Sequence, residues 1–177
     1  MNPETLEQLN AAIRDIPDFP KEGIVFKDIT PLLLQPEVFK LAIRELIQTV
    51  DGQQVDKIIG IDARGFIFGA VVAHEMGAGF IPVRKIGKLP HLTESISYSL
   101  EYGEAEIEVH RDAISPGDRV LIVDDLLATG GTAAATIQLV KRLGGHLVAA
   151  SFLIELTFLN GRDVLAEDVP VHSLLSY

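Results

Sequence analysis

The segment of residues 120–132 constrains the fold of this 177-residue chain more than any other part of it. Four consecutive apolar residues, Val120 to Val123, predict a strand that is buried on both faces, as in the interior of a parallel sheet. Asp124 and Asp125 follow this strand directly. We therefore expect both carboxylates at the carboxyl edge of the sheet, where open α/β folds bind their ligands.

The turn that follows, Ala128–Thr132, is suited to binding phosphate. Gly130 and Gly131 let the backbone approach an anion and point successive N–H groups at it, and the start of a helix adds partial positive charge. Thr129 and Thr132 can add hydroxyl donors. The turn lacks the Gly-Lys-Ser/Thr ending of a P-loop, and the chain contains no G-x-G-x-x-G, so nucleoside triphosphates and dinucleotides are poor candidates.

The acidic pair, Asp124 and Asp125, further restricts the class of ligand that the site can bind. Carboxylates repel phosphate, so the pair is expected to accept hydrogen bonds from sugar hydroxyls or to act on Mg²⁺ through its water molecules. Each feature alone would be an ordinary strand end or turn, because Asp and Gly are common turn residues. Their combination in one short segment favours a ligand site, and a phosphorylated sugar satisfies both halves of it.

Two other segments are candidates for the same edge of the sheet. Arg84, Lys85 and Lys88 form a cationic cluster after a predicted strand, although a solvated basic strip on the surface is an equally simple interpretation. The segment 62–66 follows another predicted strand and would place Arg64 where phosphates must lie. Alternatively, this segment only makes a turn and Arg64 is a surface charge.

The periodicity of the chain predicts alternating helices and strands. Helices are expected over residues 4–14, from Pro36 to near Gly52, after Gly65 through Met76 with Gly77 as the stop, and after the glycine-rich turn until Gly144. Strands are expected over 55–61, 80–83, 120–123 and 147–154, in a parallel sheet with right-handed crossovers. Residues 96–110 alternate between apolar side chains and glutamates such as Glu108, which predicts an exposed antiparallel hairpin outside the sheet.

Composition agrees with a single α/β domain over residues 1–177. The chain is 47% hydrophobic, carries a net charge of −10 and contains no cysteine, which excludes disulfides and thiolate chemistry. The acidic balance argues against general affinity for nucleic acid, and no apolar run is long enough to span a membrane. We therefore expect a cytoplasmic protein with no nucleic-acid or membrane partner. The histidines show no metal-ligand spacing, so no direct metal site is expected.

At this point the sequence resembles a known family. Residues 123–132 are similar to the phosphoribosyl-pyrophosphate signature of the type I phosphoribosyltransferases, in the form that adenine-specific members carry. The signature alone is shared with members for other bases and with regulators of the same fold. The resemblance covers nearly the whole chain and continues, in the family's order, through residues 19–20, 23–28, 62–66, 84–90, 98–103, 155–157 and 173–177.

The resemblance implies a fold and a function. The fold is α/β, the type I phosphoribosyltransferase fold, with a central, mostly parallel sheet flanked by helices, a small hood and an antiparallel flexible hairpin. The implied reaction converts adenine and 5-phosphoribosyl 1-pyrophosphate to AMP and pyrophosphate. The implied cofactor is Mg²⁺, held through substrate and water rather than by the protein. A phosphoribosyltransferase for another base and a non-enzymatic sensor of phosphoribosyl pyrophosphate are the alternatives. A homodimer is expected, because closed dimers are the commonest assembly and one cationic loop is placed to serve the neighbouring site.

The resemblance also implies roles for individual residues. The 5′-phosphate and ribose would be bound by Asp124, Asp125, Ala128, Thr129, Gly130, Gly131 and Thr132. Pyrophosphate would be bound by Asp62, Ala63, Arg64, Arg84, Lys85 and Lys88, with a cis peptide bond between Asp62 and Ala63.

Further implied roles concern the base and catalysis. Adenine would lie between Phe26 and Leu126, with Arg64 nearby and backbone groups of Val25 binding its edge, although a lone aromatic residue is more often part of the core. Glu101 would manage the purine proton and Tyr102 would belong to a lid. The expected catalytic residues are Glu101, Arg64, Asp124 and Asp125.

Overall fold

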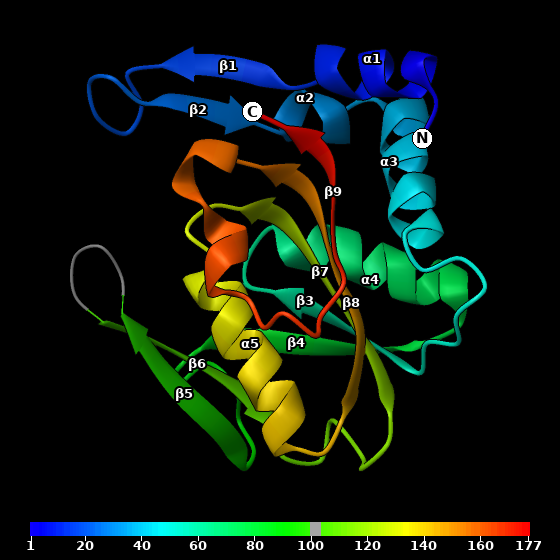
Figure 1. The fold of residues 1–177 in the computed structure, drawn as a ribbon, viewed down its shortest axis with the longest axis vertical. Helices are drawn as coiled ribbons and strands as arrows, with labels where there is room; N and C mark the ends of the chain where they lie inside the picture. The colour runs from blue at the N-terminus through cyan, green and yellow to red at the C-terminus, as the bar shows by residue number, and fades with distance from the viewer. Residues whose placement is uncertain (100–103) are drawn as a thin grey trace. The chain divides into compact units, whose positions relative to one another are not determined.

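The computed structural model describes residues 1–99 and 104–177 of the chain. The contacts within it divide the chain into two compact units, Met1–Glu45 and Leu46–Tyr177. The first unit contains a two-stranded sheet and the second a seven-stranded sheet (Figure 1). A single domain over residues 1–177 therefore stays a prediction. Within the described ranges, no helix is both long and apolar enough to cross a membrane.

The N-terminal unit consists of short elements joined by tight turns. Helix α1 is shorter than predicted, because residues after Ala12 leave the helix and enter a strand that pairs with a second, unpredicted strand. Asn2 caps α1 by accepting a hydrogen bond from the Thr5 N–H at 2.8 Å. The elements are α1 (Pro3–Ala11), β1 (Arg14–Pro17), β2 (Val25–Asp28), α2 (Thr30–Leu33) and α3 (Pro36–Gln48), the last of which spans the boundary between the units.

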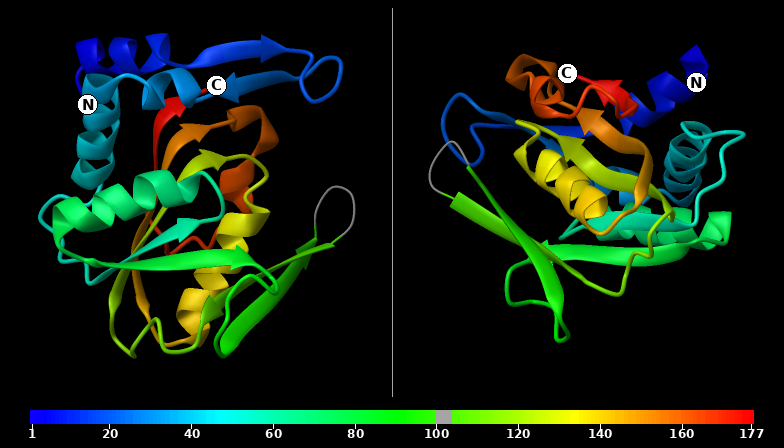
Figure 2. Two further views of the ribbon diagram at one scale, coloured as in Figure 1. Left: turned by 180° about the vertical axis from the view of Figure 1, so that it is seen from behind. Right: turned by 60° about the horizontal axis from the view of Figure 1, so that its bottom comes forward.

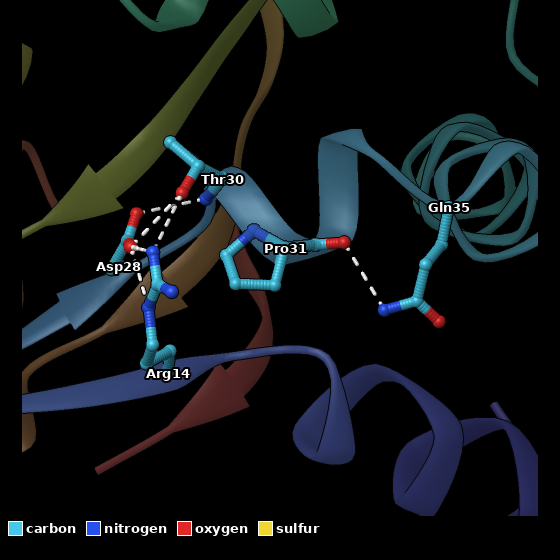
Figure 3. A network of polar contacts seen from close by, with 5 residues as sticks. All are labelled: Arg14, Asp28, Thr30, Pro31 and Gln35. Carbon is cyan, nitrogen blue, oxygen red and sulfur yellow. Dashed lines mark hydrogen bonds and ion pairs between the residues drawn. The ribbon is translucent and has the colours of Figure 1, made fainter.

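The side chain of Asp28 joins β1, β2 and α2 in one polar network (Figure 3). Its carboxylate accepts hydrogen bonds from Arg14 Nε at 3.0 Å and from the Thr30 N–H at 2.9 Å. The Thr30 N–H, followed by Arg14, lowers the pKa of Asp28 to about 2. On the far side of α2, the Gln35 amide donates to the Pro31 carbonyl at 3.1 Å. The end of β2, which begins with Val25, is thereby fixed to the helix that follows it.

The C-terminal unit is built on a sheet whose strand order is β5-β6-β4-β3-β7-β8-β9. The five strands from β4 to β9 in this order are parallel, and β6 is antiparallel both to β4 and to its hairpin partner β5. The parallel strands therefore share one carboxyl edge. The strands are β3 (Lys57–Ile61), β4 (Gly79–Lys85), β5 (Thr93–Ser99), β6 (Glu104–His110), β7 (Arg119–Leu127), β8 (His146–Glu155) and β9 (Val171–Ser176).

Helices α4 (Gly65–Met76) and α5 (Gly131–Arg142) cover opposite faces of this sheet (Figures 1 and 2). Helix α4 begins at Gly65, one residue earlier than predicted, and ends at Met76 as predicted, where Gly77 stops it with a left-handed φ of 66°. Residues of α5 such as Ile137 join the main hydrophobic core with strand residues such as Ile122. Two short 3₁₀ segments, Thr157–Leu159 and Gly161–Val164, lie between β8 and β9.

The structure differs from the predicted strands in ways that concern the site. Strand β7 continues beyond Val123, because β8 pairs with it as far as Leu127, whereas β3 pairs with it only to Val123. The cations after Val83 likewise lie partly inside β4, not after it. The prediction that the hairpin lies outside the sheet is wrong: β6 pairs with the end of β4 and extends the sheet. Strand β9 was not predicted.

The opposite, amino edge of the sheet carries an ionic clasp. Arg119, at the start of β7, donates to Asp56 from its backbone N–H at 2.8 Å, from Nε at 2.8 Å and from Nη2 at 2.6 Å. Asp56 directly precedes β3. The clasp therefore ties β3 to β7 at the end away from the predicted ligand edge.

Candidate functional site

The turn of residues 128–132, which we call the phosphate loop, joins β7 to α5. Its residues line a cavity of about 80 Å³ together with Asp124, Leu126, Leu127 and Ala133. Gly130 adopts a left-handed φ of 81° at the N-cap of α5 and has no side chain to cap the helix. The first N–H groups of this 12-residue helix are thus directed towards the turn, as an anion requires.

The backbone of the phosphate loop packs against the segment that follows β8. A Cβ atom added to Gly130 would collide with the carbonyl oxygen of Gly161, and one added to Gly161 would collide with the carbonyl oxygen of Ala128. Arg162, next to Gly161, forms an ion pair of 2.6 Å with the buried Glu155 at the end of β8. The backbone of the loop is therefore packed against a segment that is itself tied to the sheet.

The acidic pair lies at the last residues of β7, past the end of β3. Asp125 is buried and accepts a hydrogen bond from Arg64 Nε at 2.5 Å. Asp124 is partly buried and accepts from the Asp125 N–H at 2.9 Å. Burial, followed by the charge of Asp125, raises the pKa of Asp124 well above its usual range. A carboxyl group in this state can donate a hydrogen bond as well as accept one, and a nearby cation would favour its ionised form.

The start of α4 touches the acidic pair. A Cβ atom on Gly65 would lie 2.5 Å from Asp124 Oδ1 and 3.2 Å from the Val123 carbonyl oxygen. Only glycine therefore fits between the turn after β3 and the end of β7. Together with the Arg64–Asp125 ion pair, this contact brings the two predicted binding segments against each other.

We call Asp62, Arg84, Lys85 and Lys88 the cationic edge. The peptide bond between Asp62 and Ala63 is cis, as predicted. Arg84 Nε donates to Asp62 Oδ2 at 3.0 Å, and Arg84 Nη1 donates to the Lys88 carbonyl at 3.2 Å. Lys85 and Lys88 are exposed, and residues 1–99 and 104–177 show no ion pair from either side chain. Two ammonium groups therefore remain available to an anion.

Glu108 of β6 holds the segment that carries Lys88. Its Oε1 accepts from the N–H of Lys88 at 2.8 Å and of Leu89 at 2.9 Å. Burial raises the pKa of Glu108, but the N–H groups of Leu89 and Lys88 outweigh it and the pKa is lowered. The prediction that this face of the hairpin is exposed is wrong, since Glu108 is 3% exposed. Its pairing opposite Arg84 in the sheet explains the burial.

Comparison with known proteins agrees with this geometry. Residues 33–163 match the phosphoribosyl transferase domain family. Adenine phosphoribosyltransferase from Nitrosococcus oceani is 56% identical over 97% of this chain and 100% of its own length. The crystal structure of adenine phosphoribosyltransferase from Rhodothermus marinus is 57% identical, has a TM-score of 0.95, and is matched over 99% of this chain and 100% of that one.

The chain belongs to the adenine phosphoribosyltransferase family. A more distant member, the Saccharomyces cerevisiae enzyme in complex with adenine and an imino-altritol bisphosphate, is 40% identical with a TM-score of 0.91 over 97% of this chain and 98% of that one. The expected type I phosphoribosyltransferase fold is therefore confirmed, with its mixed sheet between helices and its antiparallel hairpin.

The adenine site that the family resemblance implies draws residues from both compact units. Val25 is 49% exposed in the N-terminal unit, where Phe26 stacks edge-on against Phe19 with ring centroids 5.3 Å apart. Leu126 belongs to the C-terminal unit, so the adenine site between Phe26 and Leu126 stays a prediction. Glu101 and Tyr102 lie outside the described residues.

Sequence reasoning missed two residues of this phosphoribosyltransferase that contact the site. Glu108 was assigned only to an alternating pattern, and Tyr98 only to a matching segment, yet Tyr98 Oη lies 2.8 Å from Thr132 Oγ1. The strand pairing β4–β6 and the packing of β5 on α5 create these contacts. The available signal was the even spacing of Ile96 and Tyr98 on one strand, which predicts that both face the same side.

Proposed function

We propose that this chain catalyses the transfer of the 5-phosphoribosyl group from phosphoribosyl pyrophosphate to adenine, forming AMP and pyrophosphate. The observation that carries the proposal is the phosphate loop directly beside the acidic pair, in a chain whose full-length relatives are adenine phosphoribosyltransferases. The loop suits a 5′-phosphate, and Asp124 and Asp125 suit the ribose hydroxyls. A phosphorylated sugar therefore suits both the anion cradle and the acidic pair at one strand end.

The reaction requires little covalent participation from the protein. A ring nitrogen of adenine forms a bond to the anomeric carbon while the bond from that carbon to pyrophosphate breaks, and the purine loses one proton. Positive charge builds on the ribose ring as negative charge leaves with pyrophosphate. Positioning and electrostatic stabilisation must therefore supply the rate. The carboxylates of the acidic pair face the ribose, and Arg64, Lys85 and Lys88 take the departing charge.

The cationic edge fits the pyrophosphate group. Arg84 is held in place by Asp62 and by the Lys88 carbonyl, whereas the ammonium groups of Lys85 and Lys88 are exposed. We assign pyrophosphate to Lys85, Lys88, Arg64 and the backbone at Asp62–Ala63, with Arg84 as the residue that fixes the segment. Without an anionic ligand, these two clustered ammonium groups would only be solvated charges on the surface of an acidic chain.

Mg²⁺ is the proposed cofactor, and the donor atoms at the site fit an ion that is bound through substrate and water. Within the described part of the chain, no three His, Cys, Asp or Glu side chains form a cluster that could hold a metal ion. Hard carboxylate oxygens are present at the acidic pair, and Mg²⁺ commonly keeps several waters and binds through substrate phosphates. Asp124 and Asp125 would therefore accept hydrogen bonds from its waters. When bound, the ion would neutralise charge on pyrophosphate.

The residues proposed for base recognition follow from the family resemblance. Phe26 and Leu126 would enclose adenine, backbone groups of Val25 would bind its edge, and Glu101 would accept the purine proton. Tyr102 would help to exclude water from a hydrolysable intermediate. We further propose a homodimer, in which the cationic edge of one subunit serves the neighbouring site; sedimentation of an active monomer at micromolar concentration would refute this assembly.

The deciding experiment measures initial rates of nucleotide formation from phosphoribosyl pyrophosphate with adenine, hypoxanthine, guanine, xanthine and uracil. Adenine should be preferred by about 10⁴ or more, because a site built to pair its polar edge leaves buried groups unpaired with hypoxanthine. Use of hypoxanthine within about ten-fold of adenine would refute the adenine assignment but leave the phosphoribosyl chemistry intact. Binding of phosphoribosyl pyrophosphate without turnover of any base would favour the sensor instead.

A further inference from the structure

Strand β5 is attached to helix α5 by hydrogen bonds near both ends of the helix. At the end of the helix, Arg142 Nη1 donates to the Ser95 carbonyl at 3.2 Å. At its start, Tyr98 Oη lies 2.8 Å from Thr132 Oγ1, and either atom can be the donor. The first contact only holds a strand to a helix. The second ends on the phosphate loop, so it can affect ligand binding as well.

The chemistry of the Thr132 hydroxyl decides which atom donates when a ligand is present. A hydroxyl group has one proton and two lone pairs. If a phosphate oxygen in the cradle lies within hydrogen-bond distance of Thr132 Oγ1, the only proton of that hydroxyl points at the phosphate oxygen. Tyr98 must then donate its own proton to Thr132 Oγ1, because otherwise two oxygens with no shared proton would face each other. Such chains of hydrogen bonds polarise one another and strengthen the terminal bond.

We propose that Tyr98 is a positioning residue that orients the hydroxyl of Thr132 as a donor to the 5′-phosphate. The inference rests on the proposed function, in that the cradle must receive a phosphate group. The main chain of Thr132 is already fixed, since its carbonyl accepts from Thr136 Oγ1 at 2.8 Å. The direction of its side-chain proton is what remains to be set, and Tyr98 sets it.

The ring of Tyr98 is held independently of its hydroxyl. Tyr98 pairs with Ala105 of β6, and its partly buried ring packs against the main hydrophobic core. The ring also borders a cavity of about 330 Å³ that shares Thr129 and Gly131 with the phosphate cradle. Replacing Tyr98 with Phe therefore removes one oxygen atom and leaves the ring in place. This makes Tyr98→Phe a specific test of the hydrogen bond.

The first measurement is the affinity of the full-length protein for ribose 5-phosphate and for adenosine by titration calorimetry. Tyr98→Phe should weaken ribose 5-phosphate binding by about three- to ten-fold, the range for one lost hydrogen bond, and leave adenosine, which has no phosphate, unchanged. In turnover, KM for phosphoribosyl pyrophosphate should rise more than kcat falls. Arg142→Met is the matched control: it removes the other attachment of β5 to α5 and should leave ribose 5-phosphate affinity unchanged.

A double-mutant cycle with Thr132→Val completes the test. Tyr98→Phe should cost nothing further when Thr132 has no hydroxyl, and should again weaken binding in Thr132→Ser, which restores it. Equal losses in the Thr132→Val and wild-type backgrounds, or an equal loss in Arg142→Met, would overturn the proposal. Wild-type protein that binds ribose 5-phosphate but forms no AMP would refute the adenine activity and leave this inference standing. Failure of wild-type protein to bind ribose 5-phosphate would refute both.

Discussion

The phosphate loop and the cationic edge are built in different ways, although both serve one substrate in the proposed reaction. The phosphate loop is one continuous segment between β7 and α5, and its cavity is lined by Asp124 and by residues 126–133. The cationic edge is assembled from the turn after β3 and from the end of β4 with the residues that follow it, and a buried glutamate of β6 holds it in place. A contiguous site depends on local backbone geometry, whereas an assembled site depends on strand register. The two should therefore fail in different ways when they are mutated.

The largest effect is expected for Gly130→Ala. Gly130 has a φ of 81° and its missing Cβ would collide with the backbone of Gly161, so the loop must move. A displacement of about 1 Å in a positioning segment can reduce the rate by about 100-fold, and we expect kcat/KM for phosphoribosyl pyrophosphate to fall by at least this much.

Gly117→Ala is the control for this variant. Gly117 has a similar φ of 89°, but a Cβ there would meet nothing within 4 Å. Steady-state kinetics should show near wild-type activity with only a modest loss of stability. If both variants lose activity equally, backbone strain rather than the collision with Gly161 would be the cause, and the loop would not depend on its support.

The second effect concerns the acidic pair beside the phosphate loop and its ion pair with Arg64. Asp125→Asn should reduce kcat/KM by about ten-fold or more, because it removes the charge that Arg64 pairs with at 2.5 Å and a predicted acceptor for the ribose. Thr129→Ala should produce a loss of similar size through the phosphate loop alone. Asp168→Asn, which breaks an exposed ion pair with Lys141, should leave the kinetics unchanged. Wild-type kinetics in Asp125→Asn would remove the acidic pair from the site.

The third effect is expected for a variant that alters the cationic edge and leaves the phosphate loop unchanged. Glu108→Ala removes the acceptor for two N–H groups, so the segment of Lys88 should loosen and KM for phosphoribosyl pyrophosphate should rise by about five-fold, which corresponds to the net contribution of about one typical hydrogen bond. The exposed Glu104 of the same strand provides Glu104→Ala as the control. A fall in the affinity for ribose 5-phosphate, which lacks pyrophosphate, would show instead that the two regions are not independent.

The smallest effect is a difference in how stability depends on pH, followed as Tm. The pKa of Asp124 is raised in the folded state, so ionising it costs stability as pH rises above the ordinary aspartate range. Asp124→Asn should therefore raise Tm at neutral pH and lose this advantage in acid. The pKa of Glu108 is lowered, so its charge stabilises the fold above its ordinary pKa and less as pH falls.

Glu108→Gln should accordingly lower Tm at neutral pH, and the difference from wild type should shrink in acid. Opposite signs of the Tm change at neutral pH would show that Asp124 destabilises the fold and is retained for ligand binding, whereas Glu108 stabilises the fold. Two variants with the same sign of Tm change at neutral pH would contradict this assignment.

The same contrast explains how much could be predicted from the sequence. Residues 120–132 carry their whole pattern within one segment, so the buried strand, the acidic pair, the turn and the helix were all predicted, and only the continuation of β7 to Leu127 was missed. That continuation depends on pairing with β8, which lies more than twenty residues further along the chain. Local patterns do not contain such information.

The missed features share this dependence on distant partners. Glu108 alternates with apolar neighbours as an exposed strand residue would, yet its pairing opposite Arg84 buries it. The strands β1 and β2 are only four residues long, too short for a periodic pattern to be recognised, and the first replaced the end of a predicted helix. The cis peptide bond at Asp62–Ala63 was predicted from family resemblance, not from the residues themselves.

The ionic clasp between Arg119 and Asp56 has a consequence for how this scaffold can change. It fastens β3 to β7 at their amino ends, while the turns that carry Arg64, Gly65 and the phosphate loop all leave from the carboxyl ends. Substitutions that retune the ligand edge therefore need not disturb the clasp. Redesign for another acceptor base should begin from this division: the clasp kept intact, the phosphate loop kept intact, and variation confined to the residues that would surround the base.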